Sequence, residues 1–202
     1  MTSLEVLDRV IAVLDDAGIE HMLVGAFSAI AYGLARATKD ADFVVACEPR
    51  RIAEIAATLG PEFTIEKRIE FETFTHSKRN VVAHGPSGFT IEFFYLNPDP
   101  HHQQRFQRRR RGMISPEGRG VWLPTAEDVI IQKLRWQREK DITDARNVIA
   151  VSAGSLDWEY LRRWTEQHGT TAMLARLRQE AAGGLVDGES GPHFLPEKPS
   201  SR

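Results

Sequence analysis

The stretch that decides the fold is VGAFS at residues 24–28, followed by RATKDADFVV at residues 36–45. Asp40 and Asp42 stand two residues apart at the start of an apolar run that predicts a strand over residues 41–46. Alternate side chains leave a strand on the same side, with Cα atoms roughly 6.5–7 Å apart. The two carboxylates are therefore expected to converge on one point in front of a sheet.

A carboxylate pair at this spacing predicts a site for divalent metal ions. Two metal ions about 3.5–4 Å apart can clamp an in-line phosphoryl displacement, and Mg²⁺ suits hard oxygen ligands completed by water and phosphate. We expect two Mg²⁺ ions, with Mn²⁺ as the alternative. D-x-D pairs are also common in turns and helix caps, but an uncompensated acidic pair that opens an apolar run is costly.

The segment before the acids predicts a phosphate-binding turn. Residues 21–24 indicate a short strand that ends at Gly25, and the small apolar residues 26–32 indicate a helix packed closely on the sheet. Backbone amides at the start of that helix, from Gly25 and Ala26 to Ser28, can receive triphosphate oxygens with the helix dipole behind them. Gly25 also lets the backbone approach a ligand closely.

This arrangement resembles the nucleotidyltransferase (DNA polymerase beta-like) superfamily, and in particular its small bacterial branch around the AbiEii-type toxins. The matching residues are Gly25, Ser28, Gly33, Arg36, Thr38, Asp40 and Asp42. The resemblance implies an α/β (α+β) fold with a short mixed sheet and packed helices, both aspartates on magnesium, and the glycine turn on the triphosphate. Arg36 and Thr38 join the nucleotide-binding set. Ala26 replaces the usual second glycine or serine, so either Ser28 supplies a hydroxyl or the grip on the triphosphate is weaker.

Members of this superfamily usually add a third carboxylate from a neighbouring strand, and Glu92 is the best match. In FTIEFF at residues 89–94, Glu92 lies on the strand face opposite Phe89, Ile91 and Phe93. The resemblance implies that Glu92 binds metal and helps to deprotonate the acceptor hydroxyl. The usual residue is Asp, and Glu is one methylene longer. The alternatives are a surface acid on an edge strand, or Asp99 as the third carboxylate, although NPDP at residues 97–100 first predicts a turn.

A second resemblance to the same branch lies downstream, in LPTAEDVIIQKL at residues 123–134 and REKDITD at residues 138–144. Lys133 shares a helix face with Ile130 and Leu134, and we expect it to bind the nucleotide by balancing triphosphate charge. The alternative is a lysine that covers apolar surface. Asp141 and Asp144 are expected to organise the next helix start, or to pair with Lys133 or Arg138.

A cluster of basic residues lies between these two motifs, formed by Arg105, Arg108, Arg109, Arg110 and Arg111. It could hold an RNA acceptor or nucleotide phosphates, although such runs are usually solvated loops. His101 and His102 are expected on the surface. The four tryptophans are expected to serve helix packing or the core: Trp122, Trp136, Trp158 and Trp164.

The remaining pattern divides the chain into three parts. Residues 3–17 and 49–59 predict helices, residues 63–94 predict three or four strands from their period-two pattern, and residues 119–123 predict another extended segment. Helices are expected from residue 124 to about residue 182. We therefore predict an α/β domain over 1–123, a helical subdomain over 124–182 and a disordered tail over 183–202.

The bulk composition limits the class of protein. The 202 residues carry a net charge of −2 and a single cysteine, Cys47, which excludes an internal disulfide and disfavours a cysteine-rich zinc site. The N-terminus lacks the pattern of a signal peptide, and no apolar run reaches the roughly 20 residues of a membrane span. A cytoplasmic protein without membrane contact is expected.

Three functional hypotheses follow. The first is a metal-dependent transfer of a nucleoside monophosphate from an NTP to a hydroxyl of RNA, protein or a small molecule, with release of pyrophosphate. A toxin with an antitoxin partner belongs to this hypothesis. The second is a catalytically weak or inactive module that binds RNA or a partner protein. The third is an antitoxin or scaffold that uses only its helical C-terminal part.

Overall fold

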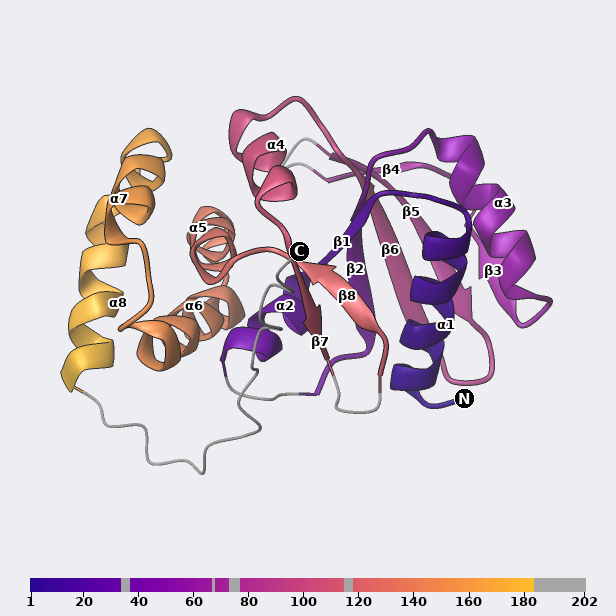
Figure 1. Ribbon diagram of the computed structural model, residues 1–202, viewed down its shortest axis with the longest axis horizontal. Helices are drawn as coiled ribbons and strands as arrows, with labels where there is room; N and C mark the ends of the chain where they lie inside the picture. The colour runs from indigo at the N-terminus through magenta and orange to yellow at the C-terminus, as the bar shows by residue number, and fades with distance from the viewer. Residues whose placement is uncertain (34–36, 67, 73–76, 115–117, 184–202) are drawn as a thin grey trace, which may run out of the picture.

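The computed structural model describes residues 1–33, 37–66, 68–72, 77–114 and 118–183. The expected tail over 183–202 lies outside this range except for Gly183, which ends the last helix. Its centre is a six-stranded mixed sheet with strand order β1-β2-β6-β5-β3 and β4 beside β5 (Figure 1). The strands are β1 (His21–Val24), β2 (Asp40–Val45), β3 (Phe63–Ile65), β4 (Glu70–Glu72), β5 (Ser77–His84) and β6 (Phe89–Tyr95). The predicted α/β fold with a short mixed sheet is confirmed.

The register of the three strands β1, β2 and β6 brings the acidic residues together. β1 runs antiparallel to β2 and places Val24 opposite Asp42. β6 runs parallel to β2 and places Glu92 opposite Asp42 on its other side. Since Gly25 follows Val24 directly, the glycine turn and two of the predicted acids meet at one point of the sheet.

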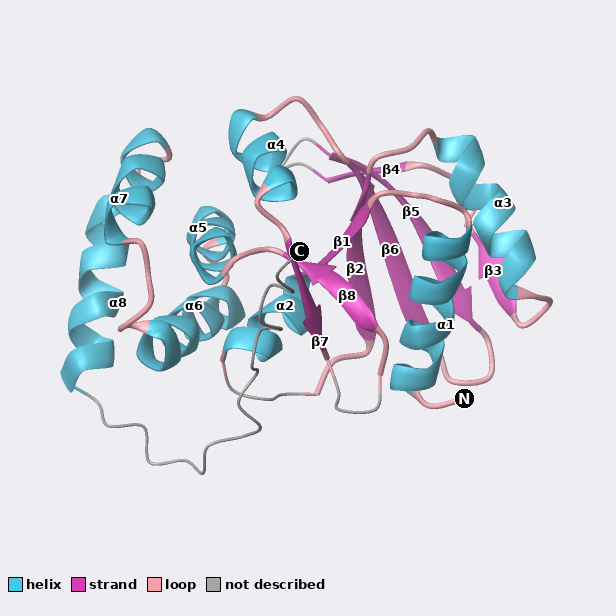
Figure 2. Cartoon of the chain, viewed as in Figure 1, coloured by secondary structure: helices cyan, strands magenta, loops and turns pink. Residues whose placement is uncertain are grey.

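One face of the sheet carries the main hydrophobic core. Helices α1 (Ser3–Asp16) and α3 (Pro49–Leu59) cover this face (Figure 2). A Thr2–Glu5 capping box starts α1, and proline at the first position starts α3. Phe43 and Phe93 stack within this core, 5.8 Å apart between ring centroids. The alternation that buries these residues turns Asp42 and Glu92 to the opposite face.

A second core belongs to the helices after the sheet: α5 (Ala126–Trp136), α6 (Glu139–Ser152), α7 (Trp158–Gln167) and α8 (Thr171–Gly183). Helix α2 (Gly25–Tyr32) connects the two parts, because it packs on β1 and β2 and also contacts α5 and α6. Ala29 of α2 is buried in the helical core. The predicted helical C-terminal part is confirmed, whereas the division into domains stays a prediction.

The basic cluster is not the loop that the sequence suggested. Helix α4 (Pro100–Gln107) holds Arg105, and a hairpin of β7 (Arg110–Met113) with β8 (Gly120–Leu123) holds Arg110 and Arg111. Asp99 caps α4 by accepting a hydrogen bond from the His102 amide at 2.9 Å. The cap and the proline at the first helical position explain why NPDP begins a helix rather than only a turn.

The expectation of surface histidines is also wrong. His101 and His102 are buried, with 0% and 3% of their surface exposed. His101 Nε2 donates a hydrogen bond to the carboxylate of buried Asp128 (3.2 Å), and its ring packs edge-on against Trp164. The structure therefore uses these residues to attach α4 to the helical core.

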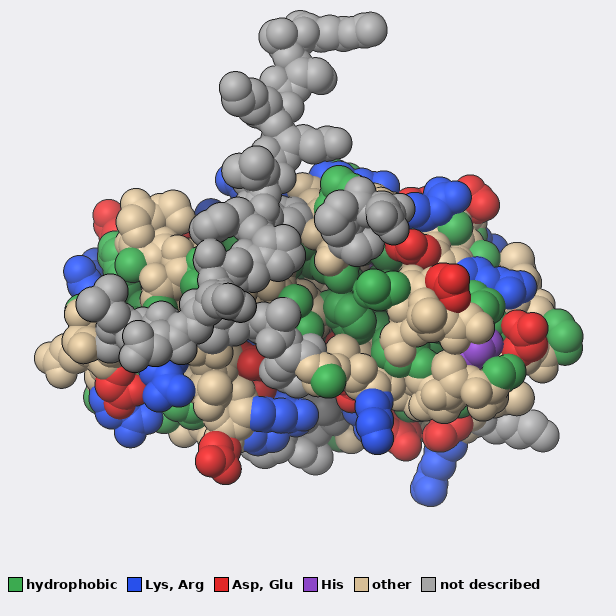
Figure 3. Space-filling model, turned by 90° about the horizontal axis from the view of Figure 1, so that it is seen from below, with side chains coloured by type: hydrophobic (Ala, Val, Ile, Leu, Met, Phe, Trp, Pro, Cys, Tyr) green, Lys and Arg blue, Asp and Glu red, His purple; other side chains and the backbone are tan. Residues whose placement is uncertain are grey.

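The surface carries no dominant charge on the face that Figure 3 shows, where Lys and Arg side chains alternate with Asp and Glu. This agrees with the net charge of −2. Within the described residues, no helix combines the length and apolarity that crossing a membrane requires.

Candidate active site

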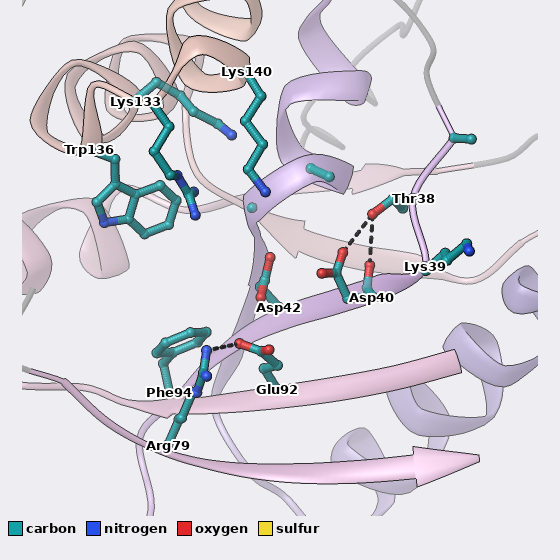
Figure 4. Close-up of a pocket in the computed structure, with 14 residues that line it drawn as sticks. Thr38, Lys39, Asp40, Asp42, Arg79, Glu92, Phe94, Lys133, Trp136 and Lys140 are labelled. Atoms are coloured by element: carbon teal, nitrogen blue, oxygen red, sulfur yellow. Dashed lines mark hydrogen bonds and ion pairs between the residues drawn. The ribbon is translucent and has the colours of Figure 1, made fainter. Parts of the chain in front are cut away.

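A pocket of about 330 Å³ opens on the sheet face opposite α1 and α3, where β2 and β6 meet the ends of α2, α5 and α6 (Figure 4). Three carboxylates, five cationic side chains and two aromatic rings are among its walls. The lining residues are Gly25, Ala26, Ala37, Thr38, Lys39, Asp40, Asp42, Arg79, Glu92, Phe94, Lys133, Trp136, Arg138 and Lys140.

Asp40 and Asp42 enter the pocket from the first half of β2. Their side chains leave the strand on one face, as the spacing predicts, and Figure 4 shows both carboxylates beside the same hollow. The Thr38 hydroxyl donates to Asp40 Oδ1 at 2.6 Å, which fixes the orientation of that carboxylate. Thr38, expected to bind nucleotide, thus lines the pocket and positions an acid.

Gly25 is required by the position of Asp42. A Cβ atom at residue 25 would lie 1.8 Å from Asp42 Oδ2 and 3.0 Å from Asp42 Cβ. The backbone at Gly25 also has φ +63°, in the left-handed region that favours glycine. The Asp42 carboxylate therefore lies directly against the backbone turn at which α2 begins.

Glu92 comes from β6 and completes the acidic group, but an arginine holds it. Arg79 Nη1 donates to Glu92 Oε2 at 2.5 Å, and Arg79 also donates from Nε and Nη2 to Glu70 Oε2 at 2.9 and 2.5 Å. Glu70 belongs to β4 and Arg79 to β5, so the ion-paired row follows the sheet from its edge to the pocket. The side chain of Glu92 is 19% exposed, which makes it more than a surface acid.

The crowding of acids raises their proton affinity. Burial raises the pKa of Asp42 to about 7, and repulsion from Glu92 and Asp40 adds to the effect. Burial also raises the pKa of Glu92, although Arg79 opposes the change. A site that penalises its own negative charge in this way is suited to bind cations.

The N-terminus of α2 supplies backbone donors beside these acids. Val24 stands at the N-cap position and has no polar side chain to satisfy the amides of the first turn. Ala26 lines the pocket as predicted. Ser28 does not: its buried hydroxyl donates back to the Gly25 carbonyl at 3.0 Å, inside the first turn of the helix. Ser28 is therefore not among the residues that line the pocket, and that it contacts nucleotide stays a prediction.

The architecture is similar to that of several solved structures. No protein-family model matches the chain, and no curated protein matches it in sequence. Solved structures do match. An antigenic nucleotidyltransferase-like protein from Paracoccidioides brasiliensis has a TM-score of 0.61 at 19% identity, over 90% of this chain and 89% of the other. The antibiotic-resistance factor ANT(2'')-Ia has a TM-score of 0.57 at 14% identity, over 90% of this chain and 97% of the other.

The lincosamide antibiotic adenylyltransferase LnuA, with lincomycin bound, has a TM-score of 0.51 at 12% identity, over 73% of this chain and 96% of the other. The chain has a nucleotidyltransferase fold. At these identities the likeness concerns the fold, and the AbiEii-type branch stays a prediction.

Lys133 lies in the wall of the pocket, and that it binds the nucleotide stays a prediction. In this nucleotidyltransferase fold it lines the pocket, and its Nζ donates to Asp141 Oδ1 at 3.0 Å and to Asp144 Oδ2 at 2.7 Å. The expected pairing with Asp141 and Asp144 is confirmed. Two carboxylates already neutralise the charge of Lys133, so exposed Lys140 and Lys39 are the more available cations of the pocket.

Several predicted residues lie elsewhere or cannot be placed. Arg36 lies outside the described residues. Asp99 pairs with Arg135 at 3.1 Å and caps α4, so it is not the third carboxylate. None of the five arginines of the basic cluster is among the residues that line the pocket.

Sequence reasoning missed about half of the residues that line the pocket, and the missed ones are Ala37, Lys39, Arg79, Phe94, Trp136, Arg138 and Lys140. Trp136 was expected to serve helix packing or the core, yet it lines the pocket, is half-buried and lies three residues after Lys133 on the same helix face. That spacing could have indicated its place. Arg79 gave no such signal, because its contact with Glu92 depends on the pairing of β5 with β6.

The residues present fit a divalent cation that shares its ligands with phosphate. Among the described residues, no group of three or more His, Cys, Asp and Glu side chains is arranged to hold a metal ion alone. Asp40 and Asp42 offer hard oxygen ligands next to backbone amides that suit a phosphate. Mg²⁺ is commonly held in this way, by one or two carboxylates plus substrate phosphates and water.

Proposed function

We propose that the protein is a metal-dependent nucleotidyltransferase, which moves a nucleoside monophosphate from an NTP to an acceptor hydroxyl and releases pyrophosphate. One observation carries this proposal. The Asp40 and Asp42 carboxylates share one face of β2, and Asp42 lies against the glycine turn that opens the uncapped α2 helix. Cation ligands and anion donors are thus adjacent, which is the combination that a metal-bound triphosphate requires.

Each group in the pocket has a place in this reaction. Asp40, held by Thr38, and Asp42 would hold Mg²⁺, which when bound neutralises phosphate charge and orients the displacement. The amides at Gly25 and Ala26 receive phosphate oxygens at the positive end of the helix dipole. Lys140 and Lys133 face the same hollow in Figure 4 and balance the remaining charge.

The bond changes follow from this placement. The acceptor oxygen forms a bond to the α-phosphorus, the bond from the α-phosphorus to the bridging oxygen of the β-phosphate breaks, and pyrophosphate leaves. The hydroxyl proton passes to the Glu92 carboxylate, whose contact with Arg79 uses only Oε2. The raised proton affinity of Glu92 suits a general base that works near neutral pH.

The proposal covers an acceptor on a small molecule, an RNA or a protein. A small molecule has the support of two structural neighbours: ANT(2'')-Ia has been solved with adenylyl-2''-tobramycin, and LnuA is a lincosamide antibiotic adenylyltransferase. RNA contact through the basic cluster has less support. Arg105 is buried, and Arg108, Arg109 and Arg111 form ion pairs within the chain. A toxin role with an antitoxin partner rests only on the sequence resemblance.

One observation favours a second candidate, a catalytically weak member of the fold that binds Mg²⁺ and NTP. Arg79 forms an ion pair with Glu92, the acid that would accept the proton. A second ion pair with Glu70 holds Arg79 in place. If the ion pair with Glu92 persists when the nucleotide binds, the positive charge of Arg79 favours the ionised form of Glu92 and makes it a weaker base for the acceptor hydroxyl. Such a protein would bind the triphosphate and turn it over slowly.

The test uses NTPs labelled at the α-phosphate, incubated with Mg²⁺ and, separately, with small-molecule, RNA and protein fractions. We expect labelled acceptor and pyrophosphate in one fraction, and loss of both in Asp42→Asn. Asp16→Asn is the matched control, because Asp16 is an exposed acid of α1 outside the pocket. Product that survives Asp42→Asn would refute the mechanism. Binding of Mg²⁺–NTP without product in any fraction would favour the weak member of the fold.

A further inference from the structure

The pocket is asymmetric along the strands, because its aromatic side chains lie at one end. Its two aromatic side chains are Phe94 and Trp136. Phe94 lies two residues beyond Glu92 on β6, and Trp136 is the last residue of α5. Ala37, Thr38 and Lys39 line the pocket before Asp40 and include no ring. With the triphosphate at the α2 N-terminus, the apolar ring system of a nucleobase matches only the aromatic end.

A small chamber adjoins these two rings. It has a volume of about 10 Å³ and shares Phe94 and Trp136 with the main pocket. Val24 and Val44 form its floor on the sheet, since they follow the same face of β1 and β2 as Asp42. A volume of this size holds about one water molecule.

The chamber is surrounded by polar groups that the described part of the protein leaves unsatisfied. Gln132 is 4% exposed, and neither its amide oxygen nor its amide nitrogen has a hydrogen-bond partner within the described residues. Both ring nitrogens of His102 and the Nε atom of Arg105 share this condition, and these residues are 3% and 4% exposed. Buried polar atoms without partners are rare in folded proteins and cost stability. Three such side chains around one chamber indicate a missing hydrogen-bonding group.

We propose that this end of the pocket is the nucleobase subsite: the base of the NTP stacks on Trp136 beside Phe94, and Gln132 contacts the edge of the base through a water in the chamber. This inference rests on the proposed function, because it places the base of the same NTP. It adds a stacking residue and a base-reading residue to the site.

The chemistry of the groups agrees with this assignment. An aromatic face stacks on any base, whereas a carboxamide offers one donor and one acceptor and can prefer one base over another. Arg138 lies over the Trp136 ring at 4.9 Å from its centroid, and Lys133 Nζ lies at 5.7 Å. Both cations line the main pocket together with this ring. Burial lowers the pKa of His102 to about 2, so its neutral ring also offers one donor and one acceptor.

The experiment compares a ligand that has a base with one that lacks it. Binding of Mg²⁺ complexes of tripolyphosphate and of the four non-hydrolysable NTPs is measured by calorimetry for the wild-type protein, Trp136→Ala, Trp136→Phe and Gln132→Leu. Trp136→Ala should weaken NTP binding by roughly 5- to 150-fold, the range of one base–aromatic stack, and leave tripolyphosphate binding unchanged. Trp136→Phe should restore most of the NTP affinity.

Gln132→Leu supplies the second readout. The ratio between the best-bound and the worst-bound NTP should shrink, while thermal stability stays level or rises, because an unpaired buried amide is removed. Unchanged NTP binding in Trp136→Ala, an equal loss of tripolyphosphate binding, or an unchanged NTP ratio in Gln132→Leu would overturn the subsite. Failure of the proposed function is distinct, since the wild-type protein would then bind neither tripolyphosphate nor any NTP with Mg²⁺.

Discussion

A side chain at position 25 would occupy the space that the Asp42 carboxylate fills, with a Cβ atom 1.8 Å from Asp42 Oδ2. Gly25, the first residue of α2, and the Asp42 carboxylate are thus in direct contact. Neither residue could change alone without moving the other. At the residue scale, this contact is what sets a cation ligand next to the amides of α2.

Gly25→Ala should therefore cost more than backbone strain. Gly18 is the matched control, because it has the same φ of +63° and no neighbour within 4 Å of an added Cβ. Gly18→Ala should lower the free energy of unfolding by about 1–2 kcal/mol. Gly25→Ala should lower it further and abolish Mg²⁺–NTP binding, as measured by denaturant unfolding and calorimetry. Equal effects of the two substitutions would show that the contact with Asp42 is unimportant.

The raised pKa of Asp42 predicts a stability cost at the site. The group has a pKa of about 7 in the folded protein and 3.8 as its ordinary value. Between these pH values the folded state binds more protons than the unfolded state, so the contribution of Asp42 to stability falls as pH rises and is lowest above pH 7. In EDTA at about pH 8, Asp42→Asn should be more stable than wild type by on the order of 1–3 kcal/mol.

The measurement is denaturant unfolding across pH, with Asp16→Asn as the exposed control. The advantage of Asp42→Asn should shrink as pH falls from about 7 and level off below about pH 3, where the wild-type carboxyl is protonated in both states. Mg²⁺ should stabilise the wild-type protein more than the variant. An advantage that is independent of pH would contradict the electrostatic explanation.

The sequence located the acids because their placement depends on strand periodicity, which is local. Asp40 and Asp42 needed only the alternation of side chains along one strand. Glu92 was chosen from the resemblance to nucleotidyltransferases, and the pairing of β6 with β2 places it opposite Asp42. Ser28 and Arg79 needed more. The Ser28 hydroxyl had a closer acceptor in its own helical turn, and Arg79 reaches Glu92 only because β4 and β5 bring Glu70 to its other side.

At the scale of elements, one buried carboxylate joins three helices. Asp128 of α5 is 0% exposed and receives hydrogen bonds from the Tyr160 hydroxyl of α7 at 2.7 Å and the Thr125 hydroxyl at 2.9 Å. It also contacts His101 of α4 and pairs with Arg108. Burial by itself would raise the pKa of Asp128, but hydrogen bonds from His101 and Tyr160 outweigh it and lower the pKa.

Tyr160→Phe should lower the free energy of unfolding by about 1 kcal/mol, the typical net value of one hydrogen bond or slightly more. Asp128→Ala should cost more, about 3 kcal/mol or above, because it leaves several buried partners unpaired. Urea unfolding measures both. Neither change touches the pocket, so Mg²⁺–NTP affinity under native conditions should stay the same. A smaller loss for Asp128→Ala than for Tyr160→Phe would contradict this network.

The sequence did not predict α4, although its residues are indispensable to that network. Helix α4 is only eight residues long and mostly polar, and the NPDP before it is typical of a turn. What buries α4 is its contact with α5 and α7, which are distant in sequence. Local pattern therefore placed the long helices α1, α3 and α5 well and missed the short one.

At the scale of the whole molecule, the pocket lies at the boundary between the sheet and the C-terminal helices. β2 and β6 supply the carboxylates, whereas α5 and α6 supply Lys133, Trp136 and Lys140. Composition predicted a globular protein without a membrane helix. The order of elements predicted a change from the α/β part to the helical part near residue 124. The convergence of both parts on one ligand site depends on how α2 packs against α5 and α6, which the sequence does not display.

A ligand held by both parts should stabilise them together. Mg²⁺ with a non-hydrolysable NTP at about 100 times its dissociation constant should raise the free energy of unfolding by about 2.7 kcal/mol. We expect a single thermal transition that moves upward as a whole, followed by circular dichroism. Tripolyphosphate without Mg²⁺ serves as the control. A shift confined to part of the transition would contradict a site shared by the sheet and the helices.

The most direct test of the central claim is a crystal structure of the protein with Mg²⁺ and a non-hydrolysable NTP. We predict a cation at about 2.1 Å from carboxylate oxygens of both Asp40 and Asp42, and phosphate oxygens at the amides of Gly25 and Ala26. A triphosphate bound elsewhere, or a cation that contacts neither aspartate, would contradict the account.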